Sequence, residues 1–331
     1  MNRGIETMRY EAYEEARDGY STVVLADRAT DSSVAVVLDI GCNIIGCRLQ
    51  GHEVIASPPH IRDLAGRSSE FGVPLLWPPS RIPGGTFAFQ GRTYTFPLNE
   101  GRNHLHGEIR YLPWEVTALA ADEQEGASVT AEFRFDRFDE VFAYYPHRVV
   151  LRLTVRLCGN RLSGLLEAVN EGDDEAPAGF GLHPYFSYRG DIEQVVLAAS
   201  VARQYDTGEN GLIVREPEHT ALCDRLAHGM PLNELPGDVD HFVFAMNEDR
   251  RECTIIRRNE GVRLRFEFSR SLPYLAVFKP SWADAVSLEP WSCITDAFNA
   301  PLPSEATGAA GLKPGQRREY GWTWSLDNLH D

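Results

Sequence analysis

The chain has 331 residues, of which 43% are hydrophobic and 24% are charged, a composition typical of a soluble globular protein. Its formal net charge of −16 excludes nucleic acid as the main partner, because a phosphate-binding surface needs an excess of basic residues. No run approaches the about 18 apolar residues of a membrane-spanning helix, and the N-terminal segment lacks the apolar stretch of a signal peptide. We therefore expect a cytoplasmic protein without a membrane partner.

The first predicted element is a short, charged helix over residues 11–17, the best helical candidate in a chain where helical periodicity is scarce. Residues 86–89 and 93–96 are predicted strands joined by Gln90-Gly91-Arg92. In residues 149–157 the odd-numbered positions are apolar, and positions 152, 154 and 156 are Arg, Thr and Arg. This period of two predicts a strand with one buried face.

Gly159-Asn160-Arg161 is predicted to turn the chain into a return strand over residues 162–169, which completes a hairpin. The same alternation recurs over residues 262–268, and the chain ends on a predicted strand over residues 320–326. Short alternating runs separated by frequent turns, in a chain with 28 Gly and 20 Pro, are typical of β-sandwiches.

The predicted fold class is therefore all-β, in the form of a large antiparallel β-sandwich. The chain contains neither an internal repeat nor a linker rich in Ser, Gly or Pro. We expect one domain over residues 1–331, with residues 1–20 as a peripheral N-terminal segment. The sequence does not indicate an oligomeric state.

Three polar clusters interrupt the predicted strands: Asn103-His104-Leu105-His106-Gly107, His183-Pro184-Tyr185-Phe186 and Leu288-Glu289-Pro290-Trp291. The imidazole of His183, beside a proline and two aromatic residues, is a titratable group in surroundings able to shift its pKa. Glu289 follows an apolar run, and burial raises the pKa of a carboxylate and prepares it to take up a proton. Together these clusters indicate acid–base chemistry.

Metal binding and redox chemistry find little support in the pattern. His104 and His106 are spaced to point the same way on a strand, as two metal ligands would, but no third ligand stands nearby. The six cysteines are scattered and form no C-x-x-C motif, which does not favour a zinc ribbon or a redox pair. We expect buried, reduced thiols and no metal.

Taken in order, the motifs resemble those of the aldose 1-epimerases, the galactose mutarotase-like enzymes that interconvert the α and β anomers of free sugars. The resemblance runs from about residue 38 to the C-terminus. The matching segments are 71–78 leading to Arg81, 99–107, 111–116, 181–186, Asp240-His241, and Glu289 with 296–299. The resemblance implies the galactose mutarotase-like supersandwich fold, a sugar substrate and no cofactor.

The resemblance also implies roles for single residues. Glu289 would be the general base and His183 the general acid. His106 and Arg81 would hold the sugar and polarise its ring and anomeric oxygens. Asn103, in the same motif as His106, would bind the substrate.

Asp240 would bind sugar hydroxyls, although Asp238 lies close enough in the sequence to compete for that role. Ser80 stands where many members of the family have asparagine before the arginine, which would alter that corner of the pocket. Four tryptophans are candidates to stack on a sugar or to fill the core: Trp77, Trp114, Trp282 and Trp291.

Three alternatives remain open at this stage. A hexose-6-phosphate 1-epimerase would use positive charge from Arg62, Arg67, Arg102 and Arg110. A glycoside hydrolase or lyase would need a second catalytic carboxylate beside Glu289, for which Glu70, Asp240 and Asp284 are available. A carbohydrate-binding or sensor protein would keep the pocket without turnover, but such a protein would not need both His183 and Glu289.

Overall fold

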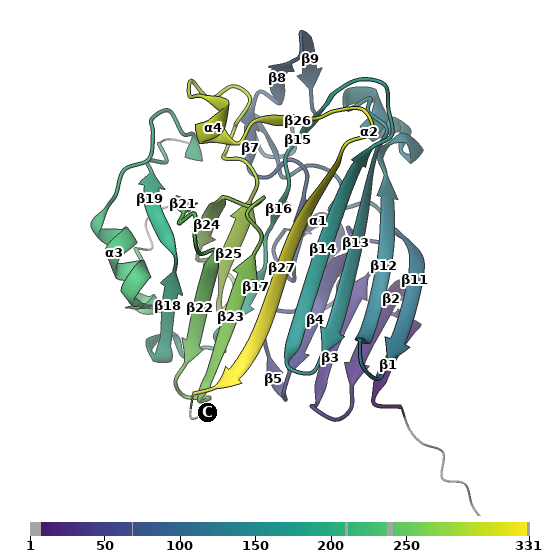
Figure 1. Cartoon of the computed structure of the whole chain (residues 1–331), viewed down its shortest axis with the longest axis vertical. Coiled ribbons are helices and arrows are strands. Elements are labelled where there is room, and N and C mark those ends of the chain that lie inside the picture. The colour runs from purple at the N-terminus through teal and green to yellow at the C-terminus, as the bar shows by residue number, and fades with distance from the viewer. Residues whose placement is uncertain (1–7, 68, 209–210, 237–240, 330–331) are drawn as a thin grey trace, which may run out of the picture.

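The computed structural model describes residues 8–67, 69–208, 211–236 and 241–329. Over these residues the fold is built almost entirely from antiparallel sheets (Figure 1), which confirms the predicted all-β sandwich. None of the helices in these ranges is long and apolar enough to cross a membrane.

The largest sheet of the described chain has nine strands in the order β11-β12-β13-β14-β27-β23-β22-β18-β20 and forms one layer of the sandwich. Its strands are β11 (Glu115–Asp122), β12 (Gly126–Arg134), β13 (Val149–Cys158), β14 (Arg161–Asn170), β27 (Arg317–Asn328), β23 (Val262–Phe268), β22 (Glu252–Arg257), β18 (Val195–Ala199) and β20 (Met230–Pro231). The predicted hairpin is confirmed as β13 and β14, whose alternate side chains are buried because only one face meets the core.

Two further sheets pack against this layer, and their strands are described here over the same residue ranges. The five-stranded sheet contains β1 (Tyr10–Arg17), β2 (Tyr20–Asp27), β3 (Ser32–Val37), β4 (Asn43–Leu49) and β5 (His52–Glu53). The seven-stranded sheet contains β19 (Val201–Tyr205), β21 (Phe242–Met246), β24 (Tyr274–Phe278), β25 (Ala285–Trp291), β16 (Gly181–Leu182) and β6 (Leu75–Leu76), with β17 (Tyr185–Ser187) paired to β25.

The remaining elements are short. Three two-strand sheets pair β7 (Arg81–Pro83) with β10 (Asn103–Leu105), β8 (Thr86–Phe89) with β9 (Arg92–Thr95), and β15 (Ala176–Ala178) with β26 (Ala310–Leu312) in the described chain. The α-helices of that part are α1 (Leu64–Arg67), α2 (Asp139–Tyr144), α3 (Ala221–His228) and α4 (Ser304–Thr307). The 3₁₀-helices are η1 (Ile61–Asp63), η2 (Phe135–Arg137), η3 (Ile192–Gln194) and η5 (Leu232–Glu234).

The main hydrophobic core lies between the layers and receives side chains from all three large sheets. On one side β2 and β3 contact β12 and β13, and in Figure 1 the purple strands lie behind the teal ones. On the other side Phe186 of β17 packs on Phe266 of β23 and Trp324 of β27, with ring centroids 5.5 and 5.1 Å apart. The seven-stranded sheet is therefore anchored to the core by the strands that carry the polar clusters.

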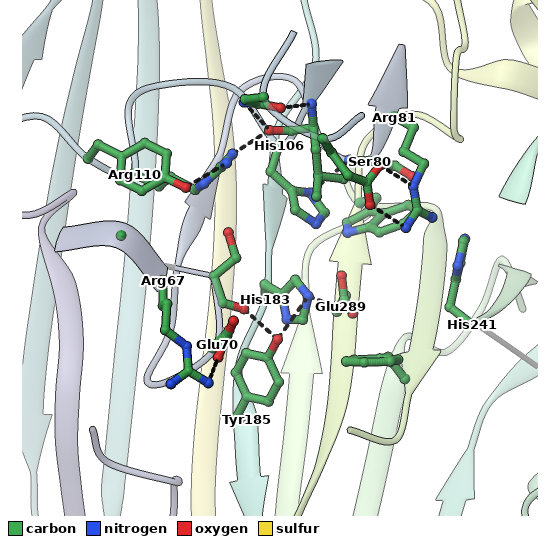
Figure 2. A pocket seen from close by; sticks show the side chains of 18 of the residues that line it. Arg67, Glu70, Ser80, Arg81, His106, Arg110, His183, Tyr185, His241 and Glu289 are labelled. Carbon is green, nitrogen blue, oxygen red and sulfur yellow. Dashed lines mark hydrogen bonds and ion pairs between the residues drawn. The ribbon is translucent and has the colours of Figure 1, made fainter. Parts of the chain in front are cut away.

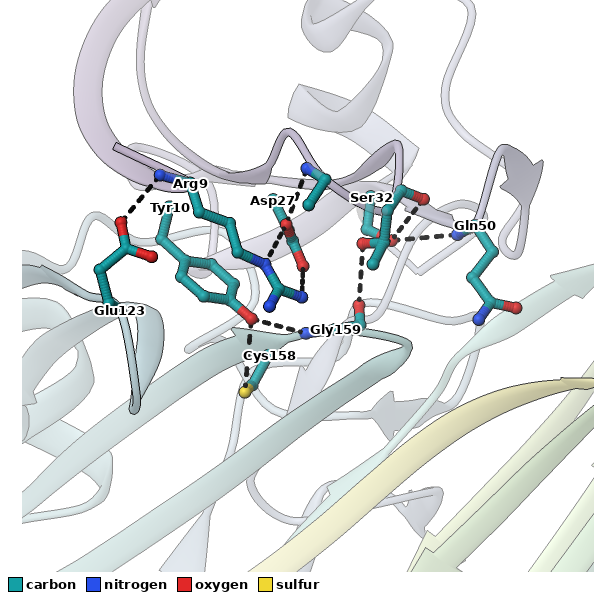
Figure 3. Close-up of polar contacts among 10 residues, drawn as sticks. Arg9, Tyr10, Asp27, Ser32, Gln50, Glu123, Cys158 and Gly159 are labelled. Atoms are coloured by element: carbon teal, nitrogen blue, oxygen red, sulfur yellow. Dashed lines mark hydrogen bonds and ion pairs between the residues drawn. The ribbon is translucent and has the colours of Figure 1, made fainter. Parts of the chain in front are cut away.

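The predicted helix over residues 11–17 is wrong, because this segment belongs to strand β1. Its residues are fair helix formers, but β1 pairs with β2 along its whole length, from Tyr10 opposite Asp27 to Arg17 opposite Tyr20. Tyr10 is 2% exposed, and its hydroxyl contacts the Cys158 thiol and the Gly159 amide at the β13–β14 turn (Figure 3). Pairing and burial together outweigh the local helical propensity.

Candidate active site

Strand β25 brings the first part of the site together. Ser287 and Glu289 are two residues apart on this strand, so their side chains project from the same face. The strands β16 and β17 both pair with β25, with Gly181 opposite Trp291 and Tyr185 opposite Ser287. The same register, continued inward by two residues, places His183 opposite Glu289.

His183 and Glu289 form a buried contact pair at the bottom of the pocket (Figure 2). The Nε2 atom of His183 lies 3.2 Å from Oε1 of Glu289, and the two side chains are only 6% and 3% exposed. Burial, reinforced by the positive charge of Arg110, lowers the pKa of His183 to about 3. Burial thus disfavours a charged His183 ring, and the Glu289 carboxylate at 3.2 Å is the group placed to offset that cost.

His106 reaches the same pocket from the bend that follows β10. Its backbone has a positive φ of 66°, and its N–H donates to the Ser80 carbonyl at 3.0 Å. In return the Ser80 N–H donates to Nδ1 of His106 at 3.0 Å, which assigns the ring hydrogen to Nε2. Burial, and then the charge of His183, lowers the pKa of His106 well below its ordinary value. His106 is thus a neutral hydrogen-bond donor whose ring meets that of His183 edge-on, at 5.3 Å between centroids.

Ser80, which stands where many family members have asparagine, contacts His106 through its backbone. The contact to His106 comes from the Ser80 backbone, while its side-chain hydroxyl turns away to Thr295 at 2.7 Å. The main chain at position 80 therefore contacts His106, and the Ser80 hydroxyl takes no part in that contact.

Arg81, on β7, is held in place by a carboxylate. Its Nε and NH2 atoms donate to the two carboxylate oxygens of Glu100 at 2.7 and 2.8 Å, a two-point contact that fixes the plane of the guanidinium. The Asn103 amide donates to the same carboxylate at 3.1 Å. Asn103 is absent from the described lining of the pocket, whereas its neighbours Asn99 and Glu100 are part of it.

These groups surround a cavity of about 410 Å³, within the range of small-molecule sites. Four of the six predicted site residues line it: Glu289, His183, His106 and Arg81. The other described lining residues are Gly66, Arg67, Ser69, Glu70, Ser80, Asn99, Glu100, Leu105, Arg110, Tyr111, Tyr185, His241, Phe278, Trp282 and Trp291. Asp240 and its rival Asp238 lie outside the described residues, although the adjacent His241 lines the cavity.

Of the four candidate tryptophans, two lie at the cavity and two lie in the core of the described structure. Trp282 and Trp291 line the cavity, whereas Trp77 and Trp114 are buried in the core. Trp282 is 44% exposed and stands at the mouth, where an apolar ring is available to stack on a sugar. His104 points away from His106, because its Nδ1 donates to the Pro97 carbonyl at 2.7 Å.

Several residues support the site in roles that the sequence did not predict: Arg110 was considered only as a charge for a phosphate, Tyr185 only as a neighbour of His183, and Ser287 not at all. Arg110 lies in the cavity wall and donates to the carbonyls of Leu105 and Gly107, so it braces the bend that carries His106. Tyr185 and Ser287 both contact His183. The period of two along β17 and β25 was the available signal, since it places Tyr185 and Ser287 beside the predicted pair.

Comparison with known proteins identifies the family of the chain. Residues 23–323 match the family model described as aldose 1-epimerase. An uncharacterised protein of Escherichia coli K12, YihR, is 24% identical over 275 residues, which cover 81% of this chain and 83% of that protein.

Two solved structures share the fold. A galactose mutarotase-like protein of Clostridium acetobutylicum superposes with a TM-score of 0.90 at 22% identity, covering 97% of this chain and 99% of that one. A galactose 1-epimerase of Lactobacillus acidophilus superposes with a TM-score of 0.78 at 18% identity, with the same coverage of both chains. Because the family model spans nearly the whole chain, the protein belongs to the aldose 1-epimerase family.

Proposed function

We propose that the protein is an aldose 1-epimerase that interconverts the α and β anomers of a free aldohexose. The observation that carries this proposal is the contact of 3.2 Å between Nε2 of His183 and Oε1 of Glu289. Two lone pairs at that distance would repel, so one proton lies between the atoms. The pair therefore contains one group able to give a proton and one able to take it.

Mutarotation needs this combination. Glu289 accepts the proton of the anomeric hydroxyl, the bond between C1 and the ring oxygen breaks as the C1 carbonyl forms, and His183 gives its Nε2 proton to the ring oxygen. Rotation about the C1–C2 bond then turns the aldehyde, and the two transfers run backwards to close the ring on the other face. The pair regains its single proton at the end, so no co-reactant is consumed.

The other pocket residues assist without exchanging protons. His106, neutral and protonated at Nε2, donates a hydrogen bond to a sugar oxygen on which negative charge develops. Arg81, fixed by Glu100, is the candidate to bind a ring hydroxyl or the ring oxygen. We further propose that Asn103 acts through Glu100 and that Asp240 binds sugar hydroxyls.

The charges of the pocket favour an uncharged sugar over a sugar phosphate. Of the four arginines considered for phosphate, Arg67 and Arg110 line the cavity. Arg67 is paired with Glu70, and Arg110 is held by two backbone carbonyls. The charge of Arg67 is therefore balanced by a carboxylate, and one nitrogen of Arg110 is already occupied by the backbone.

The same pairing disfavours hydrolysis of a glycoside. A hydrolase needs a second free carboxyl group beside Glu289. Within the described lining of the cavity, the other carboxylates are Glu70 and Glu100, and each is paired with an arginine.

The deciding experiment measures anomer exchange over a panel of aldoses and hexose 6-phosphates, by polarimetry and saturation-transfer NMR, with the uncatalysed rate subtracted. Glu289→Gln and His183→Asn are each expected to fold normally and to lose at least about 100-fold in rate, because one proton transfer is removed in each. His219→Asn and Glu305→Gln, exposed residues outside the described cavity lining, serve as matched controls and should keep full activity. Full activity in Glu289→Gln, or sugar binding by wild type without exchange, would contradict the proposal.

A further inference from the structure

The second nitrogen of the His183 ring has a defined partner. Its Nδ1 atom lies 2.8 Å from Oγ of Ser287, and the same Oγ lies 3.0 Å from the carbonyl oxygen of Pro184. A hydroxyl has one hydrogen to donate, and a carbonyl oxygen accepts hydrogen bonds but never donates one. Ser287 therefore gives its hydrogen to Pro184 and accepts one from His183, so Nδ1 of His183 is protonated.

Tyr185 constrains the opposite nitrogen in the same way. Its hydroxyl donates to the Ser69 carbonyl, and it lies 3.4 Å from Nε2 of His183. Burial, together with the charges of Glu289 and Glu70, raises the pKa of Tyr185 well above its ordinary value, so the hydroxyl keeps that hydrogen. Nε2 thus faces two oxygens, one from Tyr185 and one from Glu289, and the tyrosine has no hydrogen left to offer.

The sheet builds this arrangement as one unit. Tyr185 is opposite Ser287 in the register of β17 and β25, and Gly181 of β16 is opposite Trp291, so His183 falls opposite Glu289 between these two pairs. All four side chains lie on the same face of the two strands. Ser287 is fully buried behind the ring and does not belong to the cavity lining, so it acts on His183 and not on the sugar.

We infer that Ser287, oriented by the Pro184 carbonyl, and Tyr185, oriented by the Ser69 carbonyl, are positioning residues that hold His183 protonated at Nδ1 and leave Nε2 as the nitrogen that exchanges its proton. This inference rests on the proposed epimerase function. With Nδ1 protonated, loss of the Nε2 proton leaves a neutral imidazole that can take a proton back at the same atom. With Nδ1 bare, loss of the Nε2 proton would leave an imidazolate anion, which is far too basic to form near neutral pH.

The direct test is the protonation of the His183 ring, read by long-range ¹H–¹⁵N NMR on the whole protein labelled at histidine nitrogens. His183→Asn assigns the signals. We expect the ¹⁵N shift of a protonated Nδ1 in the wild type without any sugar, and a loss of that preference in Ser287→Ala. A wild-type His183 with a bare Nδ1 would overturn the inference.

Kinetics on the same variants provide the second readout. Ser287→Ala should lower kcat by about 10- to 100-fold, the loss of one hydrogen bond to a charged group, with KM changed by less than about 3-fold. Tyr185→Phe should lower kcat by a smaller factor. Ser287→Thr, which keeps the hydroxyl, should recover most of the activity, and Ser325→Ala, which removes a buried serine of β27, should change nothing.

The two proposals can fail separately. If the wild type shows a protonated Nδ1 that is lost in Ser287→Ala, the positioning role stands even where no aldose is epimerised. If Ser287→Ala does not fold, Ser287→Cys keeps the volume and replaces the hydroxyl by a weak acceptor. Unchanged ring protonation and unchanged kcat in the folded variant would refute the inference.

Discussion

Two of the histidines that line the described pocket, His106 and His183, differ in the group that their Nδ1 atom contacts. The Ser80 amide donates to Nδ1 of His106, which places the hydrogen of that neutral ring on Nε2. At His183 the Ser287 hydroxyl accepts from Nδ1, which leaves Nε2 to face Glu289. In the proposed mechanism His106 is therefore a fixed donor and His183 a proton carrier, although burial lowers the pKa of both.

If His106 only donates a hydrogen bond and carries no proton, replacing it should lower the rate without changing the pH profile. His106→Asn should lower kcat/KM by about 10- to 100-fold, because a donor to a partly charged oxygen is lost. The pH dependence of kcat should stay that of the wild type, since His106 does not titrate during the reaction. Polarimetry from pH 5 to 9 checks both points, with His60→Asn as the control on the surface. A changed pH profile would show that His106 carries a proton after all.

At the scale of elements, the bend after β10 depends on a glycine. Gly107 has a φ of 70°, and a Cβ atom there would lie 1.9 Å from the Trp77 carbonyl oxygen. The same bend presents His106 to the pocket and is braced by Arg110. No side chain larger than a hydrogen fits at this position.

Gly107→Ala should therefore lower the free energy of unfolding by about 2–4 kcal/mol, through backbone strain and the clash together. Gly91→Ala is the matched control, because Gly91 also has a positive φ, of 74°, but no atom within 4 Å of the added carbon. Gly91→Ala should lower the free energy of unfolding by only about 1 kcal/mol. Urea denaturation of both variants measures the difference, and equal losses would mean that the close approach to Trp77 relaxes freely.

The strands also show how much of the fold and of the candidate site could be predicted from the sequence alone. The alternation in residues 149–157 and 262–268 predicted β13 and β23, because each strand buries one face. The sequence pattern of residues 11–17 predicted a helix instead of β1, because the pairing of this segment with β2 cannot be read from local sequence. The identities of His183 and Glu289 were predicted by motif, but the register that places them opposite each other was not, since pairing between distant segments leaves no local mark. Ser287 carried no motif and emerged only with β25.

At the scale of the whole molecule, buried histidines couple stability to pH. Burial lowers the pKa of His104, His106 and His147, which have no carboxylate partner in the described structure of the kind that His183 has in Glu289, and the pKa of His147 falls to about 4. The unfolded chain binds protons at these residues near pH 6.5, where the folded protein does not. The sign is therefore fixed: folding is favoured above about pH 6.5 and loses stability as the pH falls below it.

We expect the free energy of unfolding to fall by up to about 1.4 kcal/mol per pH unit for each of these residues. His147→Gln should remove one such contribution between pH 4 and 6.5 and flatten the curve, although it also breaks the contact to Tyr94. Urea denaturation at a series of pH values gives both slopes. Identical slopes would assign the acid sensitivity to other groups.

Strand β25 has the main hydrophobic core on one face and the candidate active site on the other. Val286 and Leu288 point into the main core, and Ser287 and Glu289 point the other way, toward His183. Loosening of the hydrophobic packing around Val286 and Leu288 on heating should also displace the Glu289 carboxylate, which we propose as the general base. Thermal inactivation and melting of the interior should therefore share a single midpoint, and no partly melted form should retain turnover.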